Sequence, residues 1–449
     1  MNKIEKKVLK KITPSLKYKK IIKKVTDEIN KKLEMELKKR SLPATVELVG
    51  SIAKDTYLKN DLDIDFFIKF PTSYQKEEIG KNALSLGKKI LKNTEESYAE
   101  HPYIRGYYKK FKVEVVPCYE IEKSSQKLSA VDRTPLHTKF IKKYLPNSKK
   151  PHVRLFKQFL KGINCYGAEA EIEGFSGYLS EILILKYGSF KKLIKDTQNW
   201  KTGEKLALKK GNYPNFETPL TFIDPVDANR NVASAISKEK FELFIKACKE
   251  YLKKPSIKFF FPNKIKPWSL KKITDEIKKQ KYSYVSVNFE KPKIISENLY
   301  PQVRKAIRSI QEICKRHDFK IIDTKFCINK EIYIIIKTKT KELPSTKKHV
   351  GPPVELTENV NDFIKKWEND PRVSKKPYEK NGRFYVEIKR NYTNIKDLLL
   401  NEIKNLSLGK NIDMVIKNKF MVLETKDLIK NELRMFWTEY LENKMPWER

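Results

Sequence analysis

The sequence predicts an α+β protein of several domains, and three observations support this fold class. The 449 residues exceed what one hydrophobic core usually serves, so we expect two to four domains. Strand-like and helical segments alternate over residues 14–116, and a helical stretch follows over 154–194. A second mixture of helices and strands begins after a proline-containing connector at 261–268.

The first region predicts a mixed sheet with helices on one side. Pro14 stands at a helix start, and apolar residues then recur every three or four positions up to residue 40, which indicates an amphipathic helix with a solvated lysine face. Residues 45–49, 62–70 and 107–116 are rich in β-branched and aromatic side chains and are predicted strands. A Gly50-Ser51 turn and a short helical segment separate the first two.

The rest of the chain predicts one helical and one α+β region. Apolar clusters over 154–194 indicate helices, and the helical domain extends to the connector. Beyond it we expect a helix at 302–317 and strands at 320–328, 331–339 and 383–389. The stretch 341–353 contains three prolines and predicts an irregular surface loop.

The charge predicts a polyanionic partner. Lys and Arg number 95 against 56 Asp and Glu, a formal net charge of +39. Such an excess stores self-repulsion, which phosphate groups relieve while releasing their own counterions, so nucleic acid is the expected partner. The alternative, that a lysine-rich genome places lysine at neutral surface positions, stays open.

Several other classes of protein are excluded. The sequence has no run of about 18 apolar residues and no lipidation signal, so we expect no membrane association. The charged first residues lack the apolar stretch of a signal peptide, which predicts a soluble cytoplasmic protein. The five cysteines form no C-x-x-C pair and the histidines show no zinc spacing, so we expect reduced thiols and no structural zinc.

Three acidic residues predict a metal site. Asp63 and Asp65 alternate along a strand, so their side chains share a face and repel each other unless a cation lies between them or one takes up a proton. Glu114 stands between valines on a later strand, a costly place for an unpaired charge. Carboxylate oxygens suit Mg²⁺, and two such ions can stabilise an in-line phosphoryl displacement.

A phosphate-binding turn precedes these acids. Gly50 lets the backbone approach a phosphate closely, Ser51 adds a hydroxyl at a helix start, and Lys54 adds a charge. A D-x-D on a strand or a Gly-Ser turn alone would be a weak signal. Both together, in this order and about a dozen residues apart, are a specific signal.

With these motifs the sequence resembles the DNA polymerase β superfamily and, more closely, the archaeal-type (class I) CCA-adding tRNA nucleotidyltransferases. The closer resemblance rests on segments spread over the whole chain: 50–54, 115–119, 134–138, 166–169, 174–179, 224–225, 230–233, 349–354 and 446–447. It implies addition of C, C and A to the tRNA 3′ end from CTP and ATP. It also implies a polymerase β-like catalytic head (1–150), a helical neck completing the nucleotide pocket (151–262), a body (263–300 and 385–449) and a tail that binds the tRNA elbow (301–384).

The resemblance also implies roles for single residues. Ser51 and Lys54 should contact the triphosphate, and His137, Lys157 and Tyr166 should complete the nucleotide pocket. Two residues depart from the family pattern: Lys54 stands where some relatives have arginine, which loses a bidentate fork, and Glu114 where aspartate is usual. On local pattern alone, His137 could be a packing histidine, Lys157 part of an amphipathic helix and Tyr166 a core residue.

Base choice is expected to fall to Arg230. Asp227 and Arg230 lie three positions apart and would share a face on a helix, and Arg230 could donate to acceptors on cytosine and adenine alike. A salt bridge between the two residues is the alternative. The C-terminal Trp437, Tyr440 and Trp447 are interpreted as packing anchors.

The expected mechanism uses two Mg²⁺ ions. One, held by Asp63, Asp65 and Glu114, would lower the pKa of the RNA's 3′ hydroxyl, and the other would neutralise the leaving pyrophosphate. A poly(A) polymerase-like enzyme and a catalytically inactive tRNA-binding protein are the rival functions. The oligomeric state is open, with a homodimer as one possibility.

Overall fold

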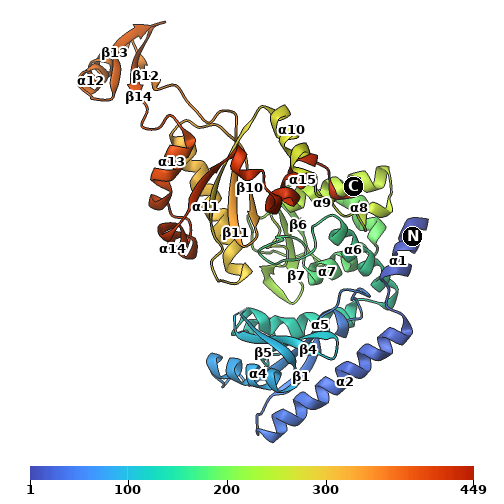
Figure 1. Cartoon of the computed structure of the whole chain (residues 1–449). Helices are drawn as coiled ribbons and strands as arrows, with labels where there is room; N and C mark the ends of the chain where they lie inside the picture. Colours follow the sequence, from blue (N-terminus) through green and yellow to red (C-terminus); the bar gives the residue numbers. More distant parts are fainter. Residues whose placement is uncertain (99) are drawn as a thin grey trace. The chain divides into compact units, whose positions relative to one another are not determined.

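The computed structural model describes residues 1–98 and 100–449. The chain forms two compact units (Figure 1). Unit 1 comprises residues 1–263 together with the last five residues, 445–449, and unit 2 comprises residues 264–444. The short C-terminal segment belongs to unit 1 because the indole of Trp447 stacks on Phe259, with ring centroids 5.1 Å apart.

Unit 1 begins with a five-stranded mixed sheet. Its order is β1-β2-β5-β4-β3, and β2 and β5 run parallel while all other neighbours are antiparallel. The strands are β1 (Thr45–Val49), β2 (Ile64–Phe70), β3 (Lys92–Tyr98), β4 (Pro102–Tyr108) and β5 (Phe111–Tyr119). The mixed sheet predicted from the sequence is therefore confirmed.

Two helices cover one face of this sheet. Helices α2 (Leu16–Lys39) and α4 (Lys76–Ile90) bury their apolar stripes against the strand residues of one parity, such as Phe66 and Val115. Ser15, rather than Pro14, caps α2 by accepting a hydrogen bond from Tyr18 N. The residues of the other parity, Asp65 and Glu114 among them, therefore face away from these helices.

The rest of unit 1 is mainly helical. A core rich in aromatic side chains joins α1 (Lys3–Ile12), α6 (Lys150–Gly162), α7 (Gly177–Tyr187), α8 (Phe190–Thr197) and α9 (Lys238–Lys253). A small sheet of β6 (Glu204–Leu206), β7 (Leu220–Asp224) and β8 (Asp227–Asn231) flanks these helices. Helix α5 (Arg133–Tyr144) contacts β1, α3 (Gly50–Ala53) and α7, and so bridges the sheet and the helical part.

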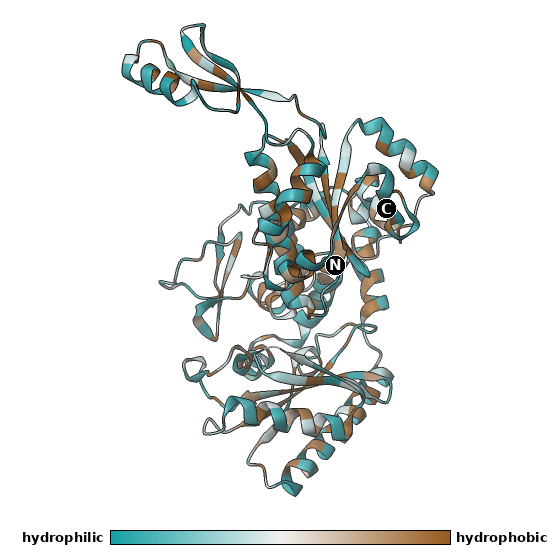
Figure 2. Ribbon diagram, turned by 60° about the vertical axis from the view of Figure 1, so that its left-hand side comes forward, coloured by the Kyte–Doolittle hydropathy of each residue, from teal (hydrophilic) through white to brown (hydrophobic). Residues whose placement is uncertain are grey.

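Unit 2 contains an antiparallel sheet covered on both faces. Its strands, in the order β10-β11-β9-β15, are β9 (Ser283–Glu290), β10 (Ile321–Ile328), β11 (Glu331–Thr338) and β15 (Met421–Glu424). Helices α11 (Ser296–Arg316), α13 (Ile395–Glu402) and α14 (Lys410–Asn418) cover one face. Helices α10 (Leu270–Gln280) and α15 (Arg434–Glu442) cover the other, where Trp437 is fully buried as predicted. Figure 2 shows apolar colour concentrated between these layers.

A second, three-stranded sheet in unit 2 corrects one sequence-based expectation. Its order is β12-β14-β13, with β12 (Thr346–Pro353), β13 (Val373–Lys380), β14 (Arg383–Lys389) and helix α12 (Thr357–Trp367). The loop predicted at 341–353 is therefore mostly strand. Pro352 and Pro353 stand at its end, where the register with β14 shifts, and β12 is an edge strand of this sheet, a position that tolerates proline.

The segment 301–384 contributes to both sheets of unit 2. Most of helix α11 and all of strands β10 and β11 fall inside this segment, and they build the core of the four-stranded sheet. Only β12 to β14 and α12 form the separate small sheet. Pairing between β9 and β11 joins residues 41 to 55 positions apart, which no local pattern reveals.

Two further findings concern the chain as a whole. Within the described residues, no helix combines the length and the apolar character needed to cross a membrane. All five cysteines are free thiols, and four of them are buried.

Candidate active site

The three acidic residues lie on one face of the first sheet. Asp65 on β2 stands directly opposite Glu114 on the parallel strand β5, so both side chains project from the face away from α2 and α4. Asp63 lies one residue before β2 begins, not within the strand as expected, and its side chain is 47% exposed. The sheet thus places the three carboxylates within electrostatic reach of one another.

Asp65 shows the consequence of this crowding. Burial, followed by the charges of Glu114 and Asp63, raises the pKa of Asp65 to about 8. Like charges at short range cannot all stay ionised cheaply in a buried site, and one carboxyl takes up a proton. The proton uptake expected in the absence of a cation therefore falls on Asp65.

Two basic residues are bound to the other carboxylates. The guanidinium of Arg105 donates from Nε to Glu114 Oε1 at 2.7 Å, and the ammonium of Lys112 lies 3.4 Å from Asp63 Oδ1. Among the described residues no group of three or more acidic, histidine or cysteine side chains is gathered closely enough to hold a metal. The charge of Glu114, which would be costly to leave unpaired at this position, is thus balanced by Arg105.

Arg105 was missed by the sequence analysis, although a signal existed. The turn of Lys109 and Lys110 pairs Tyr108 with Phe111, and this register places Arg105 opposite Glu114. Recognising the hairpin would have identified the pair.

The predicted Gly-Ser turn lies against Asp65. Gly50 has φ of +71°, and a Cβ on this residue would stand 2.1 Å from Asp65 Oδ2. Only glycine meets both demands, because it adopts this backbone conformation freely and leaves room for the carboxylate. The next residue, Ser51, lies on the single-turn helix α3 (Gly50–Ala53), and its hydroxyl has no hydrogen-bond partner among the described residues.

Lys54 and Lys157 meet in a buried ionic cluster. Glu181, fully buried on α7, accepts from Lys54 Nζ at 2.6 Å, from Lys157 Nζ at 3.2 Å and from the hydroxyl of Thr56 at 2.5 Å. Burial lowers the pKa of Lys54, which Glu181 partly offsets. Burial alone would raise the pKa of Glu181, but the two lysine charges outweigh it and lower this pKa. Glu181 was not predicted, because the apolar helix around it gives no sign of ionic partners that lie 24 and 127 positions away.

His137 and Arg230 converge on another unpredicted acid, Asp224. This buried carboxylate, at the end of β7, accepts from His137 Nε2 at 2.8 Å, Arg230 Nη1 at 2.9 Å and the Tyr178 hydroxyl at 3.1 Å. His137 also stacks on Tyr178, with ring centroids 3.9 Å apart. Burial lowers the pKa of His137, and the charge of Arg230 lowers it further against the opposing effect of Asp224. His137 therefore stays neutral near pH 7.

The expected helical pairing of Asp227 with Arg230 is wrong. Both residues lie on strand β8, where positions three apart point to opposite faces. Asp227 is bound instead to Lys127 and Arg133, at 2.7 and 3.1 Å. The hairpin of β7 and β8 forms because Pro225 and Val226 turn the chain, a signal that the helical interpretation overlooked.

Tyr166 is half-buried and lies near the carboxylates of Glu181 and Asp61. Burial, with the charges of Glu181 and Asp61, raises the pKa of Tyr166, so its phenol stays protonated. The ammonium of Lys161 lies 5.3 Å from the centre of its ring. Tyr166 thus lies between the Glu181 cluster and the loop that carries Asp61 and Asp63.

A mixed sheet that carries facing acids beside a Gly-Ser turn defines this protein as a nucleotidyltransferase of the polymerase β type. Family models agree: residues 30–137 match the nucleotidyltransferase domain, 151–261 the second domain of tRNA nucleotidyltransferase, and 281–425 the C-terminal domain of the CCA-adding enzyme. The chain is 35% identical over 442 residues to the CCA-adding enzyme of Methanosarcina mazei, covering 97% of each chain. It is 36% identical over 405 residues to that of Archaeoglobus fulgidus, covering 88% of this chain and 90% of the relative. The chain belongs to the family of archaeal-type CCA-adding enzymes.

The function follows from this membership. The chain is an RNA nucleotidyltransferase, and CCA addition to the 3′ end of tRNA is its activity. Among solved structures, the Cid1 poly(U) polymerase with Mg 3′-dATP resembles 57% of this chain and 94% of its own, at 16% identity and a TM-score of 0.45. That likeness is too low to support an argument.

Proposed function

We propose that Asp63, Asp65 and Glu114 hold Mg²⁺ and that this site transfers nucleotides from CTP and ATP to the tRNA 3′ end. The observation that carries the proposal is the pairing of Asp65 with Glu114 on neighbouring parallel strands, next to Asp63. A carboxyl beside two other acids binds either a proton or a cation at neutral pH, in line with the raised pKa of Asp65. The oxygen donors and the close approach of Gly50 to Asp65 fit a small, hard cation with a phosphate ligand.

The chemistry requires the carboxylates to change partners. Asp65 gives up its proton, and the ion pairs of Glu114 with Arg105 and of Asp63 with Lys112 loosen. Mg²⁺ bound there would lower the pKa of the RNA's 3′ hydroxyl and offset the charge of the leaving pyrophosphate. The hydroxyl oxygen then attacks the α-phosphate, and the bond to the pyrophosphate breaks.

The Gly50-Ser51 turn and the Glu181 cluster form the proposed triphosphate site. The Ser51 hydroxyl is free to donate to a phosphate, and the buried cluster of Lys54, Lys157 and Glu181 carries one net positive charge. A positive charge in a poorly solvated position attracts an anion more strongly than one in water. Tyr166, protonated and close to the cluster, adds a hydroxyl donor.

Arg230 is the proposed reader of the base. Asp224 holds its guanidinium at one nitrogen, which leaves other N–H groups free to donate to acceptors on cytosine and adenine. His137, which is neutral and hydrogen-bonded to the same Asp224 carboxylate, forms part of the wall of the proposed nucleotide pocket. Asp227 supports the pocket from outside through Lys127 and Arg133.

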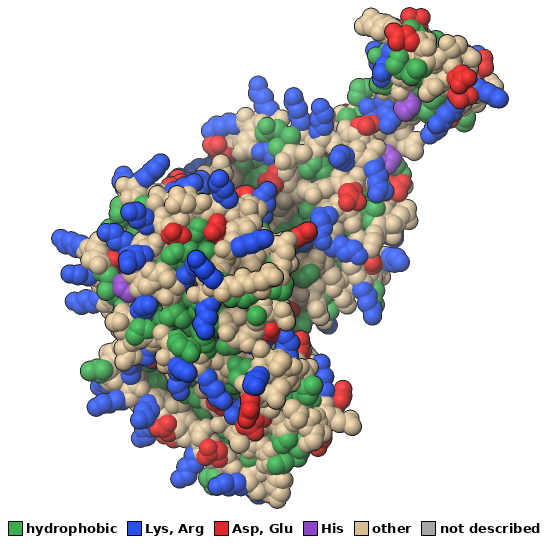
Figure 3. All heavy atoms as spheres, turned by 180° about the vertical axis from the view of Figure 1, so that it is seen from behind, with side chains coloured by type: hydrophobic (Ala, Val, Ile, Leu, Met, Phe, Trp, Pro, Cys, Tyr) green, Lys and Arg blue, Asp and Glu red, His purple; other side chains and the backbone are tan. Residues whose placement is uncertain are grey.

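The remaining expectations concern tRNA and the state of the protein. Lys and Arg side chains are spread over the face shown in Figure 3, and the formal charge of +39 favours binding of the tRNA acceptor stem and elbow. We assign head, neck, body and tail roles to 1–150, 151–262, 263–300 with 385–449, and 301–384. Free thiols fit a cytoplasmic location. Light scattering tests for a homodimer.

The decisive experiment is incubation with tRNA lacking its 3′ end, Mg²⁺ and CTP, ATP or both, resolved at single-nucleotide length. We expect two cytidines and one adenosine, followed by arrest. An open-ended adenosine ladder would instead indicate a poly(A) polymerase, and no extension would indicate a binding protein.

The roles of the carboxylates are tested separately with Glu114→Ala. This change should abolish extension while leaving the Kd for CTP within a few-fold, because Glu114 acts on the attacking hydroxyl and not on the triphosphate. Full activity in this variant would refute the assignment.

A further inference from the structure

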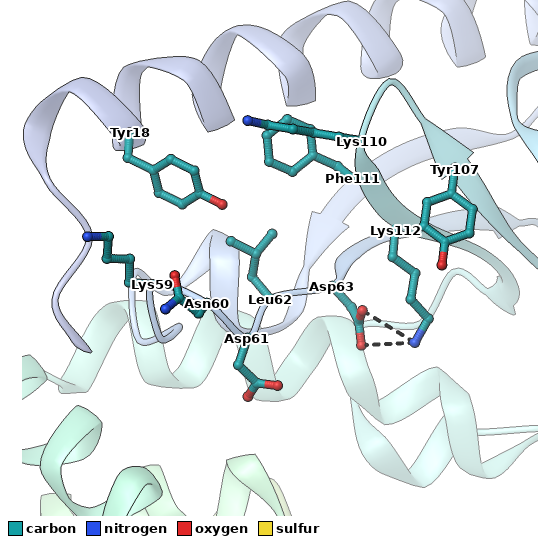
Figure 4. A pocket seen from close by; sticks show the side chains of 10 residues that line it. All are labelled: Tyr18, Lys59, Asn60, Asp61, Leu62, Asp63, Tyr107, Lys110, Phe111 and Lys112. Atoms are coloured by element: carbon teal, nitrogen blue, oxygen red, sulfur yellow. Dashed lines mark hydrogen bonds and ion pairs between the residues drawn. The ribbon is translucent and has the colours of Figure 1, made fainter. Parts of the chain in front are cut away.

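A pocket opens beside Asp63 at the end of the first sheet where α2 begins. It has a volume of about 630 Å³ and is lined by α2, by the loop before β2 and by the β4–β5 hairpin (Figure 4). This volume lies within the range of about 300–1,000 Å³ that is usual for ligand sites. Gly50, Ser51 and Lys54 do not line it, so it is distinct from the proposed triphosphate site.

The charges in the pocket favour an anion. Its two acids are already bound to cations, Asp61 to Lys161 and Asp63 to Lys112. Lys59 and Lys110 also line the pocket, and neither forms an ion pair with a carboxylate of the described residues. Two uncompensated ammonium groups beside the reactive centre would attract phosphates.

Aromatic rings add a second, independent feature. Tyr107 on β4 is 45% exposed although it is a large apolar ring, and Tyr18 of α2 directs its hydroxyl into the open space in Figure 4. Exposed aromatic rings interleaved with lysines are typical of surfaces that bind single-stranded RNA, where bases stack and the backbone follows the charges. A nucleoside triphosphate site would need no such extended arrangement.

We infer that this pocket binds the last nucleotides of the RNA strand that is being extended. Their phosphates contact Lys59 and Lys110, and a base stacks on Tyr107. Lys112, which lines the pocket, is bound to Asp63, and a cation held by Asp63 would free the ammonium of Lys112 to contact the RNA backbone. This inference rests on the proposed function, because it places the 3′ hydroxyl beside Asp63.

The hairpin turn supplies a matched control. Lys109 and Lys110 are neighbours in the same turn, but Lys109 donates to Glu28 at 2.7 Å and does not line the pocket. The variants Lys109→Ala and Lys110→Ala each remove one positive charge from the same turn. Only Lys110→Ala removes a charge that lines the pocket.

The test measures binding of a short fluorescent single-stranded RNA by anisotropy, in the full chain without nucleotide or metal, over a range of salt concentrations. Tyr107→Ala should weaken binding about fivefold or more, the effect of one lost base stack, and Tyr107→Phe should restore it. Lys110→Ala should reduce the salt slope by about one, and Lys109→Ala should not. In extension assays the KM for RNA should rise in Tyr107→Ala and Lys110→Ala, while the Kd for CTP stays constant.

Other outcomes would overturn the inference. Equal losses in Lys109→Ala and Lys110→Ala would mean general attraction by a basic surface. A weakened CTP affinity with unchanged RNA affinity in Tyr107→Ala would make the pocket a nucleotide site. Failure of the proposed function is distinguishable, because it would appear as absent extension in the unaltered protein, whatever the variants do to RNA binding.

Discussion

Replacing Glu181 by glutamine would remove the carboxylate that neutralises two buried lysines. Glu181 is fully buried, and its oxygens lie 2.6 Å from Lys54 Nζ and 3.2 Å from Lys157 Nζ. Glutamine has nearly the same volume and keeps an oxygen that can accept from Thr56, so the substitution changes the charge and little else.

Two arguments give the size of the effect. Removing one partner of a buried ion pair costs about 3–5 kcal/mol, because the other charge stays buried and unpaired. The lysine can escape this cost by losing its proton, and at pH 7 deprotonating a group with an ordinary pKa of 10.5 costs about 5 kcal/mol. We therefore expect the free energy of unfolding of unit 1 to fall by about 3–5 kcal/mol at pH 7.

The pH dependence separates charge from packing. Without Glu181 the folded-state pKa of Lys54, which burial already lowers, falls further, while its unfolded-state pKa does not change. Between these two values the unfolded state binds more protons, so the stability of the variant rises with pH. The difference from the unaltered protein should shrink by about 1.4 kcal/mol per pH unit for each lysine that becomes neutral.

Urea denaturation combined with hydrogen exchange of α6 and α7 peptides would measure the stability of unit 1. Glu242→Gln, on the exposed side of α9, is the control and should stay within about 0.5 kcal/mol. Adding Lys54→Met to Glu181→Gln should recover part of the loss. A loss below about 1 kcal/mol, or one independent of pH, would refute the account of this cluster.

Three further predictions concern the carboxylate face. Gly50→Ala should nearly abolish nucleotide extension yet cost only about 1 kcal/mol of stability in melting experiments, because its Cβ would displace the Asp65 carboxylate and strain a single residue. Asp65→Asn should raise the melting temperature of the metal-free protein at pH 9 but not at pH 4: with a folded pKa of about 8 against 3.8, Asp65 costs stability as pH rises between these values. Arg105→Ala should tighten Mg²⁺ binding by the nucleotide-free protein in calorimetry, because a competing cation on Glu114 is removed.

Each of these three predictions would be contradicted by a specific result. Wild-type extension by Gly50→Ala would mean that Asp65 does not need its present position. Equal melting shifts at both pH values in Asp65→Asn would leave the raised pKa without support. Unchanged or weaker Mg²⁺ binding in Arg105→Ala would make Arg105 a positioning residue for Glu114 and not a competitor.

Much of the molecule follows from local sequence patterns. Period-two and period-3.6 hydrophobic patterns predicted β1, β2, α2 and the long helix α11, because such patterns place one apolar face of an element toward a core. Strand β3 and helix α4 were not predicted, and the strand predicted at 107–116 divides into β4 and β5 at the turn of Lys109 and Lys110. The D-x-D strand, the Gly-Ser turn and a family resemblance spread over the chain were enough to predict the nucleotidyltransferase class and CCA addition, which the family matches confirm.

Other features are decided by tertiary structure. Glu181 and its partner Lys54 are 127 positions apart in the sequence, and Asp224 and its partner His137 are 87 apart. The packing of the elements therefore decides which carboxylate binds each of these two pocket residues. Asp227 and Arg230 point to opposite faces because both lie on a strand, which forms by pairing with β7 and not through local spacing. A buried charge is costly unless an opposite charge or a hydrogen-bond partner lies next to it. Local sequence patterns show which residues are charged, but the distances between these residues depend on the tertiary structure.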